Sequence, residues 1–461
     1  MKIAGERDAL RGDAVMQKEL TAPSFLEQIT AVVPDRRQID FQNMAYYNFI
    51  HFGLNTFTRK EWGSGKVSPE VFKLRDIDTD AWARQLKATG STGIVLTAKH
   101  HDGFCLFPSA YTDYTISATG YRGGHGDLVA QLAASCQKFG LKFGIYLSPW
   151  DRHEPTYGTE AYNDFFCGQL TELCTRYGEI FCFWFDGACG EGKNGKKQRY
   201  DWDRYFEIIR RLQPNAVITN CGPDVRWIGN ERGKARKSEF SVVSRRLQDN
   251  LKIAEQSQQK AGVTVMLRAP AFTDSALGNR EQLIGEELCW YPAEMNIPIT
   301  YFGWFWRPLF EIFFTRTVRN LEKCYLTSVG NNATLLVNVP PNNKGQLPAK
   351  YIGRLLGMKK RLDRRFSRRA DILRQEDTGR GRKIWIRPQT VRTVVLSEDV
   401  THSQRVEAFH LVSGGRTVYS GTTIGFKKIC ILKRPLKVCT ELQLVIDRCR
   451  KEPHIRTMEA F

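Results

Sequence analysis

Short apolar runs that end in a chemically reactive side chain recur in the first half of the chain. The clearest run occupies residues 180–185, ends at Asp186 and is stopped by Gly187. Three similar segments occupy residues 49–53, 93–104 and 142–151. In the first, the apolar run leads into a histidine; in the second, into two histidines and an aspartate; in the third, into Ser-Pro-Trp-Asp. Continuous apolar runs of this length are typical of parallel strands that are covered on both faces.

Amphipathic segments separate these runs and carry helix start and stop signals. The segment 79–90 begins with Thr-Asp and ends at glycine, and the segments 127–140 and 160–178 also end at glycine. A fourth apolar stripe, within 205–212, precedes the apolar run 216–220. Alternation of helix, glycine and strand predicts an α/β fold with a (β/α)8-type, TIM-like barrel. A doubly wound open sheet is the alternative, and we favour it less because no glycine-rich phosphate loop follows the first strand.

The polar groups lie at the same end of each predicted strand. A single strand-terminal aspartate or histidine is usually structural, for example as the cap of the next helix. Four strands with reactive groups at one end are difficult to explain by folding requirements alone. Because active sites of (β/α)8 barrels lie at the carboxyl ends of the strands, Asp186 and the strand-end histidines are predicted to share one site.

Six ordered sequence blocks resemble the signature blocks of glycoside hydrolase family 29, the α-L-fucosidases. The blocks are His-Phe-Gly at 51–53, His-His-Asp-Gly-Phe at 100–104, Tyr-Leu-Ser-Pro-Trp-Asp at 146–151, Trp-Phe-Asp-Gly at 184–187, Arg-Trp-Ile-Gly-Asn-Glu at 226–231, and the block 328–341. The resemblance covers most of the chain between residues 40 and 350. The block 226–231 resembles the branch of the family that prefers α-1,3/1,4-linked fucose.

The resemblance implies a retaining exo-α-L-fucosidase that hydrolyses α-1,3/1,4-linked L-fucose from branched oligosaccharides or glycoconjugates. Retaining glycosidases place two carboxyl groups about 5–5.5 Å apart, one as nucleophile and one as acid/base. By resemblance, Asp186 is the nucleophile and Glu231 is the acid/base. Without the motif, Glu231 would fit a solvated residue in a basic loop. The acid needs a raised pKa, which an apolar wall of Trp227 and Ile228 could supply.

The resemblance also implies a fucose pocket made of histidines, a further carboxylate and aromatic rings. Neutral imidazole can both donate and accept a hydrogen bond, which suits sugar hydroxyls. Fucose lacks a 6-hydroxyl group, so an apolar wall is expected beside its methyl group, and Trp304 or Phe305 is the candidate. The implied substrate-binding residues are His51, Glu61, Trp62, His100, His101, Tyr146, Trp184 and Trp304. Ordinary core packing is the alternative explanation of the aromatic cluster 301–306.

The segment before Gly-Trp-Phe at 303–305 departs from the family pattern. Relatives often carry arginine and proline there, whereas this chain reads Pro-Ile-Thr-Tyr-Phe over 298–302 and is one residue longer. The segment 232–271 is also unusually basic. These departures concern the leaving-group side of the site, so they leave the linkage preference open. They also leave open a catalytically impaired, fucose-binding relative.

A metal-dependent barrel hydrolase is a less favoured alternative. Its ligands would be His51, His100, His101 and Asp102. Adjacent histidines on a strand point to opposite faces, so both rarely bind one ion unless the strand has already ended. In the favoured mechanism two carboxyl groups supply the proton transfer and the covalent step, so neither a metal nor an organic cofactor is required.

Length and late-chain patterning predict more than one domain. The 461 residues suffice for a barrel and one further domain. Period-two apolar patterns and a Gly-Gly turn near the C-terminus predict a small antiparallel β-sandwich after the barrel. The predicted units are an N-terminal polar extension at 1–30, the catalytic barrel at 31–350, a basic helix and linker at 351–384, and the sandwich at 385–461.

The charge is strongly basic, with a formal net value of +19 and a concentration of arginine and lysine over 359–383. A solvated helix face is the simpler explanation, and contact with a polyanion is the alternative. No nucleic-acid-binding motif accompanies the cluster. The expected partner is therefore a fucosylated oligosaccharide substrate, and no nucleic acid is expected.

Neither a membrane span nor a signal peptide is recognisable in the sequence. Twelve cysteines without a Cys-x-x-Cys pair indicate buried free thiols in a reducing compartment. These features predict a cytoplasmic protein without a membrane partner. The sequence leaves the oligomeric state undetermined.

Overall fold

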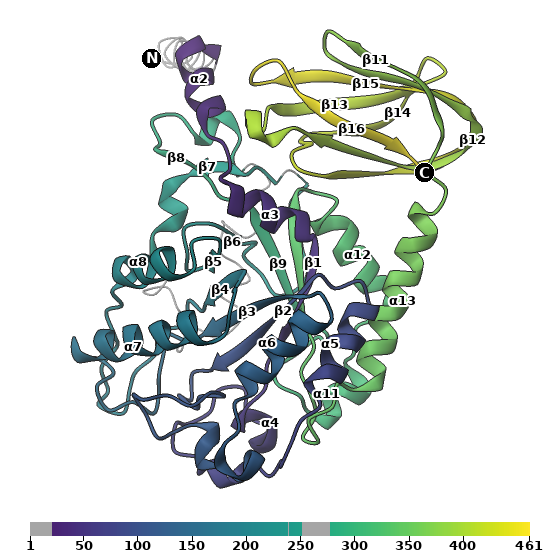
Figure 1. The fold of residues 1–461 in the computed structure, drawn as a ribbon. Coiled ribbons are helices and arrows are strands. Elements are labelled where there is room, and N and C mark those ends of the chain that lie inside the picture. The colour runs from purple at the N-terminus through teal and green to yellow at the C-terminus, as the bar shows by residue number, and fades with distance from the viewer. Residues whose placement is uncertain (1–20, 238, 251–276) are drawn as a thin grey trace, which may run out of the picture.

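A nearly closed barrel of eight parallel strands forms the larger part of the structure (Figure 1). The computed structural model describes residues 21–237, 239–250 and 277–461. In barrel order the strands are β5 (Val217–Asn220), β4 (Cys182–Phe185), β3 (Lys142–Leu147), β2 (Gly93–Lys99), β1 (Tyr46–Ile50), β10 (Ala333–Asn338), β9 (Ala293–Pro298) and β6 (Arg226–Trp227). A parallel bridge between Thr219 and Val225 brings β5 next to β6. The predicted TIM-like barrel is confirmed, and the open doubly wound sheet is excluded.

Helices cover the barrel and begin at the polar caps that the sequence indicates. They are α5 (Thr79–Ala88), α6 (Leu128–Lys138), α7 (Ala161–Arg176), α8 (Trp202–Leu212), α12 (Val318–Ser328) and α13 (Ala349–Phe366). The carboxylates of Asp78, Asp127 and Asp201 accept hydrogen bonds from the first turns of α5, α6 and α8, which stabilises these helix starts. Gly140 and Gly178 follow α6 and α7 in the left-handed region, at φ 62° and 74°, where glycine ends a helix without strain.

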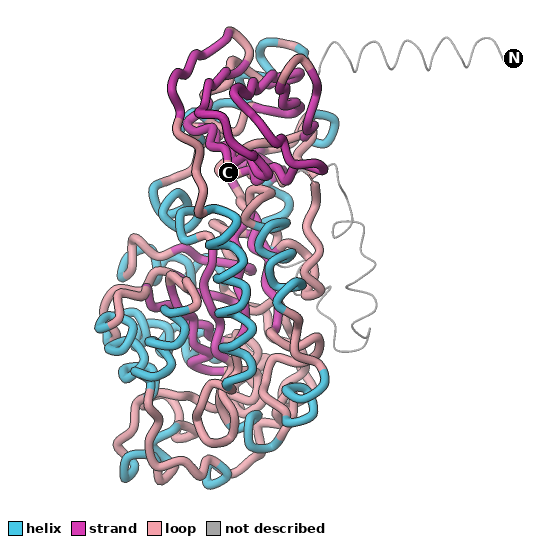
Figure 2. Tube along the Cα trace, turned by 90° about the vertical axis from the view of Figure 1, so that its right-hand side faces the viewer, coloured by secondary structure: helices cyan, strands magenta, loops and turns pink. Residues whose placement is uncertain are grey.

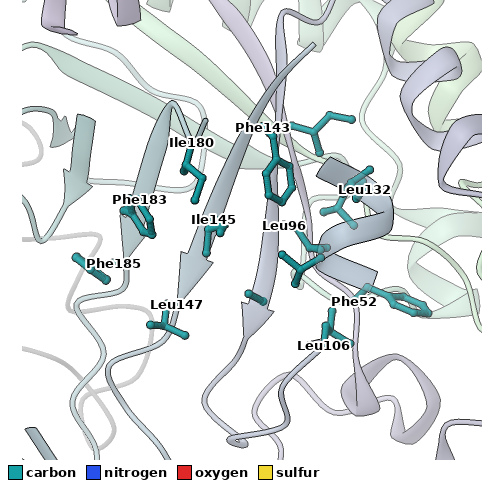
Figure 3. Close-up of a cluster of buried hydrophobic side chains, with 14 of the residues drawn as sticks. Phe52, Leu96, Leu106, Leu132, Phe143, Ile145, Leu147, Ile180, Phe183 and Phe185 are labelled. Atoms are coloured by element: carbon teal, nitrogen blue, oxygen red, sulfur yellow. The ribbon is translucent and has the colours of Figure 1, made fainter. Parts of the chain in front are cut away.

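Alternate residues of the strands contribute to two separate apolar clusters. Ile145 and Phe183 pack with helix residues such as Leu132 in the layer between strands and helices (Figure 3). Tyr146 and Trp184, their neighbours in sequence, belong to a second cluster inside the barrel. Because successive side chains of a strand point to opposite faces, this alternation places Tyr146 and Trp184 together on the inner side.

A six-stranded antiparallel sheet forms the C-terminal domain. Its strands are β11 (Ile372–Thr378), β12 (Gly381–Glu398), β13 (Val406–Ser413), β14 (Arg416–Gly421), β15 (Lys428–Cys449) and β16 (Ile455–Ala460). The long strands β12 and β15 pair over two stretches separated by shifts of register, and such irregularities bend strands. The sheet thus curls around one core that includes Phe409, Leu411 and Leu444. The antiparallel β domain predicted after the barrel is confirmed.

Parts of the predicted N-terminal extension and of the predicted linker form regular secondary structure that packs with the domains. The predicted extension 1–30 lies partly outside the described residues, but α2 (Pro23–Ala31) packs Ile29 with Val242 and Trp290. The predicted linker ends early, because the antiparallel sheet begins with β11 at Ile372 instead of at residue 385. β11 is an edge strand whose central residues are all exposed, so it lacks the apolar alternation that reveals a strand.

The C-terminal domain packs on one end of the barrel, as Figure 2 shows, and the arrows of Figure 1 identify this end as the amino-terminal end of the barrel strands. Just before β10, the Asn332 N–H donates to the Lys427 carbonyl at 3.0 Å, and Lys428 Nζ donates to Asn331 Oδ1 at 2.8 Å. The carboxyl ends of the strands therefore face away from this domain.

The remaining short helices and strands are α3 (Arg36–Met44), α4 (Leu54–Thr58), α11 (Pro308–Phe313), β7 (Val242–Ser244) and β8 (Leu288–Trp290).

The cysteines are free thiols, and all of them except Cys449 are buried. This confirms the prediction of buried thiols made from their spacing. Within the part of the chain that the structure describes, no helix is long and apolar enough to cross a membrane.

Candidate active site

Polar and aromatic side chains gather at the carboxyl ends of the barrel strands. His51 follows β1, His100 and His101 follow β2, and Asp186 follows β4 directly. The ring centroids of His51 and His100 lie 5.6 Å apart, and those of His100 and His101 lie 4.1 Å apart. His101 Nε2 lies 3.7 Å from Asp186 Oδ2. The structure therefore brings these four residues into one site.

Asp186 presents its carboxylate beside His101. Strand β4 is fully buried, whereas the Asp186 side chain is 29% exposed. Its Oδ2 accepts a hydrogen bond from the Tyr146 hydroxyl at 3.0 Å, and its Oδ1 accepts one from the Ala188 N–H at 2.9 Å. Bonds to both oxygens fix the plane of the carboxylate and leave it accessible, which suits a nucleophile.

Glu231 lies on the loop after β6, where its charge interacts with that of Asp186. Glu231 is exposed to solvent, although protein atoms lie close around its carboxyl group. The loss of hydration raises the pKa of Glu231 to about 7, and the nearby carboxylates of Asp186 and Glu61 add to this shift. A hydrogen bond with the Trp304 side chain acts in the opposite direction. A carboxyl group that retains its proton near neutral pH can act as a general acid.

Hydrogen-bond partners fix the tautomers of two histidines. Ser148 Oγ donates to a backbone carbonyl at 2.6 Å and therefore accepts from His101 Nδ1 at 2.7 Å. His51 Nδ1 donates to Asn338 Oδ1 at 2.9 Å, because the amide nitrogen of Asn338 already donates to a backbone carbonyl at 2.7 Å. In both rings Nε2 is left as a hydrogen-bond acceptor.

All three histidines are neutral near pH 7. Burial lowers the pKa of His51 to about 3 and the pKa of His101 to about 4, although Asp186 opposes the shift of His101. Burial also lowers the pKa of His100 well below its usual value. His100 Nδ1 is buried and has no hydrogen-bond partner among the described residues.

Glu61 connects two loops of the site. Its Oε1 accepts a hydrogen bond from the Trp304 N–H at 2.5 Å, and its Oε2 pairs with the Arg307 guanidinium at 3.2 Å. Burial raises the pKa of Glu61, and these two partners oppose the shift. Glu61 therefore holds the loop after β9 in place, and its charge also reaches Glu231.

Aromatic rings supply apolar surface around the histidines. The Trp304 ring lies 5.0 Å from His51, and the buried Phe305 ring stands edge-on to His100 at 4.9 Å. Both candidates for the apolar wall thus contact the histidine cluster. Trp62 is 45% exposed, and its ring lies 6.3 Å from His101.

Trp184 is oriented by a carboxyl group inside the barrel. Its ring stacks on Tyr146 at 5.6 Å, and its Nε1 donates to Glu294 Oε1 at 2.9 Å. Glu294, on β9, also accepts a hydrogen bond from the Tyr47 hydroxyl, and burial raises its pKa to about 7. Because the indole N–H is used inside the barrel, Trp184 can offer a ligand its ring but not a donor.

Four residues that the sequence did not single out support the predicted ones: Ser148, Asn338, Glu294 and Arg316. Ser148 and Asn338 lie within the blocks 146–151 and 328–341. Each is a polar residue at the end of an apolar run, and this pattern could have identified them as site residues. Glu294 is likewise a carboxylate within a fully buried strand. Arg316 gives no sequence signal; its Nη2 donates to the Glu231 carbonyl at 3.2 Å.

The predicted alternative of a metal site is not favoured by the arrangement of the donors. Strand β2 ends at Lys99 and the rings of His100 and His101 lie on the same side, so alternation along a strand is not an argument against this site. Asp102 is buried, its Oδ1 accepts from the Phe104 N–H at 3.3 Å, and burial raises its pKa to about 7. Over residues 21–237, 239–250 and 277–461, no three His, Cys, Asp or Glu side chains are spaced to hold a metal ion.

Known proteins with similar sequences and structures belong to one group. The sequence model of the α-L-fucosidase family matches residues 28–365. Alpha-L-fucosidase 1 of Arabidopsis thaliana is 35% identical over 466 aligned residues, which cover 92% of this chain and 86% of that protein. A Bacteroides ovatus structure of the α-L-fucosidase type has a TM-score of 0.85 and 37% identity, covering 95% of this chain and 76% of that one. A family 29 fucosidase of Ruminococcus gnavus in complex with fucose has a TM-score of 0.76 and 27% identity, covering 93% and 95%.

Proposed function

The chain belongs to the α-L-fucosidase family, glycoside hydrolase family 29, and from this premise we propose a retaining exo-enzyme that releases α-1,3/1,4-linked L-fucose from branched oligosaccharides or glycoconjugates. The family and its relatives make the protein an α-L-fucosidase. The stereochemistry, the roles of individual residues and the linkage preference constitute the proposal.

In the first step Asp186 attacks the anomeric carbon of fucose while Glu231 donates its proton to the glycosidic oxygen. The bond between that carbon and the glycosidic oxygen breaks, an ester bond to Asp186 forms, and the leaving sugar departs with the proton of Glu231. In the second step Glu231, now ionised, takes a proton from water, whose oxygen attacks the anomeric carbon. The ester bond breaks, and fucose is released with its configuration retained.

The observation that carries the proposal is the pairing of Asp186 with Glu231. Asp186 is accessible at the end of β4, and its charge contributes to raising the pKa of Glu231 to about 7. Two interacting carboxyl groups, one of which keeps its proton near neutral pH, fit a nucleophile and an acid/base residue.

Recognition of fucose is assigned to the histidine cluster and the rings around it. The Nε2 atoms of His51 and His101 accept hydrogen bonds from sugar hydroxyls, and His100 lies between these two rings. Trp304 or Phe305 supplies the apolar surface for the methyl group. The further binding residues proposed are Glu61, Trp62, Tyr146 and Trp184.

The linkage preference rests on the block 226–231 alone. This block places Glu231 on the loop after β6, and Trp227 within it donates to Asn296 Oδ1 at 2.5 Å. The position of the acid determines from which side the glycosidic oxygen is protonated, so a different loop would suit a different linkage.

The test is release of free fucose from a Lewis-type trisaccharide, a 2-linked fucosyl-lactose and an aryl fucoside, with Asp186→Ala as the control. We expect the trisaccharide to be the preferred substrate and the control variant to be inactive. Preference for the 2-linked or the aryl compound would retain the fucosidase and reject the linkage. No release from any of the three would support the catalytically impaired relative instead.

A further inference from the structure

The loop after β9 carries exposed aromatic side chains beside the proposed acid/base residue. Tyr301, Phe302 and Phe313 are 46%, 55% and 70% exposed. The base of the loop is well defined, because Thr300 and Thr315 form an antiparallel bridge and the Tyr301 N–H donates to the Phe314 carbonyl at 2.8 Å.

Arg316 connects this loop to Glu231. The guanidinium is fully buried; Nε donates to the Pro298 carbonyl at 2.8 Å, Nη1 to Asn320 Oδ1 at 3.0 Å and Nη2 to the Glu231 carbonyl at 3.2 Å. Its central carbon lies 4.8 Å from the centre of the Tyr301 ring. Among the described residues, no carboxylate pairs with Arg316, so neutral oxygens and the Tyr301 ring are its partners.

These contacts place Tyr301 one side chain away from the main-chain carbonyl of Glu231, and Tyr301 is open to solvent. If Glu231 protonates the glycosidic oxygen, the ring of the leaving sugar begins at the atom that Glu231 touches. Fucose itself occupies the inner side, towards Asp186 and the histidines. A leaving sugar that extends outward from Glu231 can therefore reach the exposed Tyr301.

We propose that Tyr301, held in place by Arg316, is the platform on which the first sugar ring of the leaving group stacks. The ligand is a neutral pyranose, which presents a face of C–H groups to the aromatic ring and its hydroxyls to water. One face of the Tyr301 ring is occupied by the guanidinium, and its exposed surface serves the sugar. This inference rests on the proposed function, because it requires Glu231 to be the acid.

The experiment compares two substrates that differ only in the leaving group. The Lewis-type trisaccharide has a leaving sugar, whereas L-fucosyl fluoride has only a fluoride ion and cannot contact Tyr301. For Tyr301→Ala we expect kcat/KM on the trisaccharide to fall about five- to tenfold, mainly through KM, because a stacked ring contributes roughly that factor. The rate with L-fucosyl fluoride should stay unchanged.

Two further variants show which property of the ring is used. Tyr301→Phe keeps the ring and should retain the wild-type kcat/KM on the trisaccharide. Phe313→Ala removes a more exposed ring of the same loop, one without a contact to Arg316 among the described residues, and should also leave it unchanged.

An equal loss on both substrates for Tyr301→Ala, no loss on the trisaccharide, or the same loss for Phe313→Ala would overturn the assignment. These outcomes differ from failure of the proposed function. In that case the wild-type protein would release fucose from neither compound, and the inference would fall with it.

Discussion

At the scale of single residues, the two carboxyl groups of the proposed catalytic pair have different surroundings. Asp186 accepts hydrogen bonds from Tyr146 and the Ala188 N–H and is accessible at the end of a strand. Glu231 lies on a loop, and restricted hydration together with neighbouring carboxylates raises its pKa to about 7. Different environments for two carboxyl groups are the means by which one site can hold both a nucleophile and an acid.

Replacement of Asp186 by alanine tests the nucleophile. We expect Asp186→Ala to lower kcat at least about 10³-fold, because the covalent step is lost. Binding of fucose, measured by calorimetry, should be retained, since His51, His100 and His101 remain. Added azide should partly restore turnover of an aryl fucoside and give a fucosyl azide of inverted configuration. Retention of near wild-type rates would reject Asp186 as the nucleophile.

Replacement of Glu231 tests the acid/base through pH and leaving group. A general acid must carry its proton, so wild-type kcat/KM on the trisaccharide should fall as pH rises above about 7, the pKa of Glu231. Because Glu231 and Asp186 interact, the measured midpoint belongs to the pair. For Glu231→Ala we expect a much larger loss on the trisaccharide than on L-fucosyl fluoride, whose leaving group needs little protonation. Equal losses on both would remove Glu231 as the acid.

At the scale of elements, the strands were predictable and the loops that complete the site were not. A parallel strand leaves a continuous apolar run with a reactive end, which is why β1, β2, β3 and β4 could be placed from the sequence. Strand β6 has only two residues, so no apolar run marks the approach to Glu231. Its position depends on Arg316, 85 residues further along the chain, and no local pattern reports such a contact. Resemblance to a family, not periodicity, identified Glu231.

Strand β9 carries a second buried acid whose titration affects the stability of the barrel. Burial raises the pKa of Glu294 from 4.5 to about 7, so between these values the folded protein binds more protons than the unfolded chain. The free energy of unfolding contributed by this group therefore falls as pH rises through that window. Glu294→Gln removes the titration, and Gln cannot accept from both Tyr47 and Trp184 as well as a carboxylate does.

We expect Glu294→Gln to lower the Tm at about pH 5 and to lose less, relative to wild type, at about pH 8. Thermal unfolding followed by circular dichroism at several pH values gives this difference. Glu70→Gln, at an exposed carboxylate, should show no such trend. A Tm deficit that grows with pH would contradict the proposed direction. Loss of Trp184 orientation should also raise KM for an aryl fucoside.

At the scale of the whole molecule, the site and the second domain lie at opposite ends of the barrel. The C-terminal sheet contacts the amino-terminal end of β10, while the proposed carboxyl pair belongs to the other end. The basic helix was predicted to expose its charges to solvent. Two of its arginines instead form ion pairs with a neighbouring helix, because Arg361 and Arg365 of α13 both pair with Glu322 of α12. The C-terminal domain is therefore expected to contribute to stability and not to fucose binding.

A buried ionic cluster between the two domains allows that expectation to be tested. Glu407 of β13 is fully buried; it accepts from Arg280 Nε at 2.8 and 3.0 Å and from Arg450 Nε at 3.0 Å. Arg450 also donates to the Gly278 carbonyl, so the cluster joins the sheet to a segment of the barrel domain. Removing one partner of such a cluster leaves buried cations without their anion, which typically costs about 3–5 kcal/mol.

We therefore expect Glu407→Ala to reduce the free energy of unfolding by about 3 kcal/mol or more, measured by denaturant titration. KM for the trisaccharide should stay at the wild-type value below the unfolding transition, because the proposed sugar-binding residues lie at the other end of the barrel. Glu376→Ala removes an exposed partner of Arg374 and should change the stability by less than about 1 kcal/mol. A raised KM in a Glu407→Ala protein of normal stability would instead indicate that the C-terminal domain takes part in substrate binding.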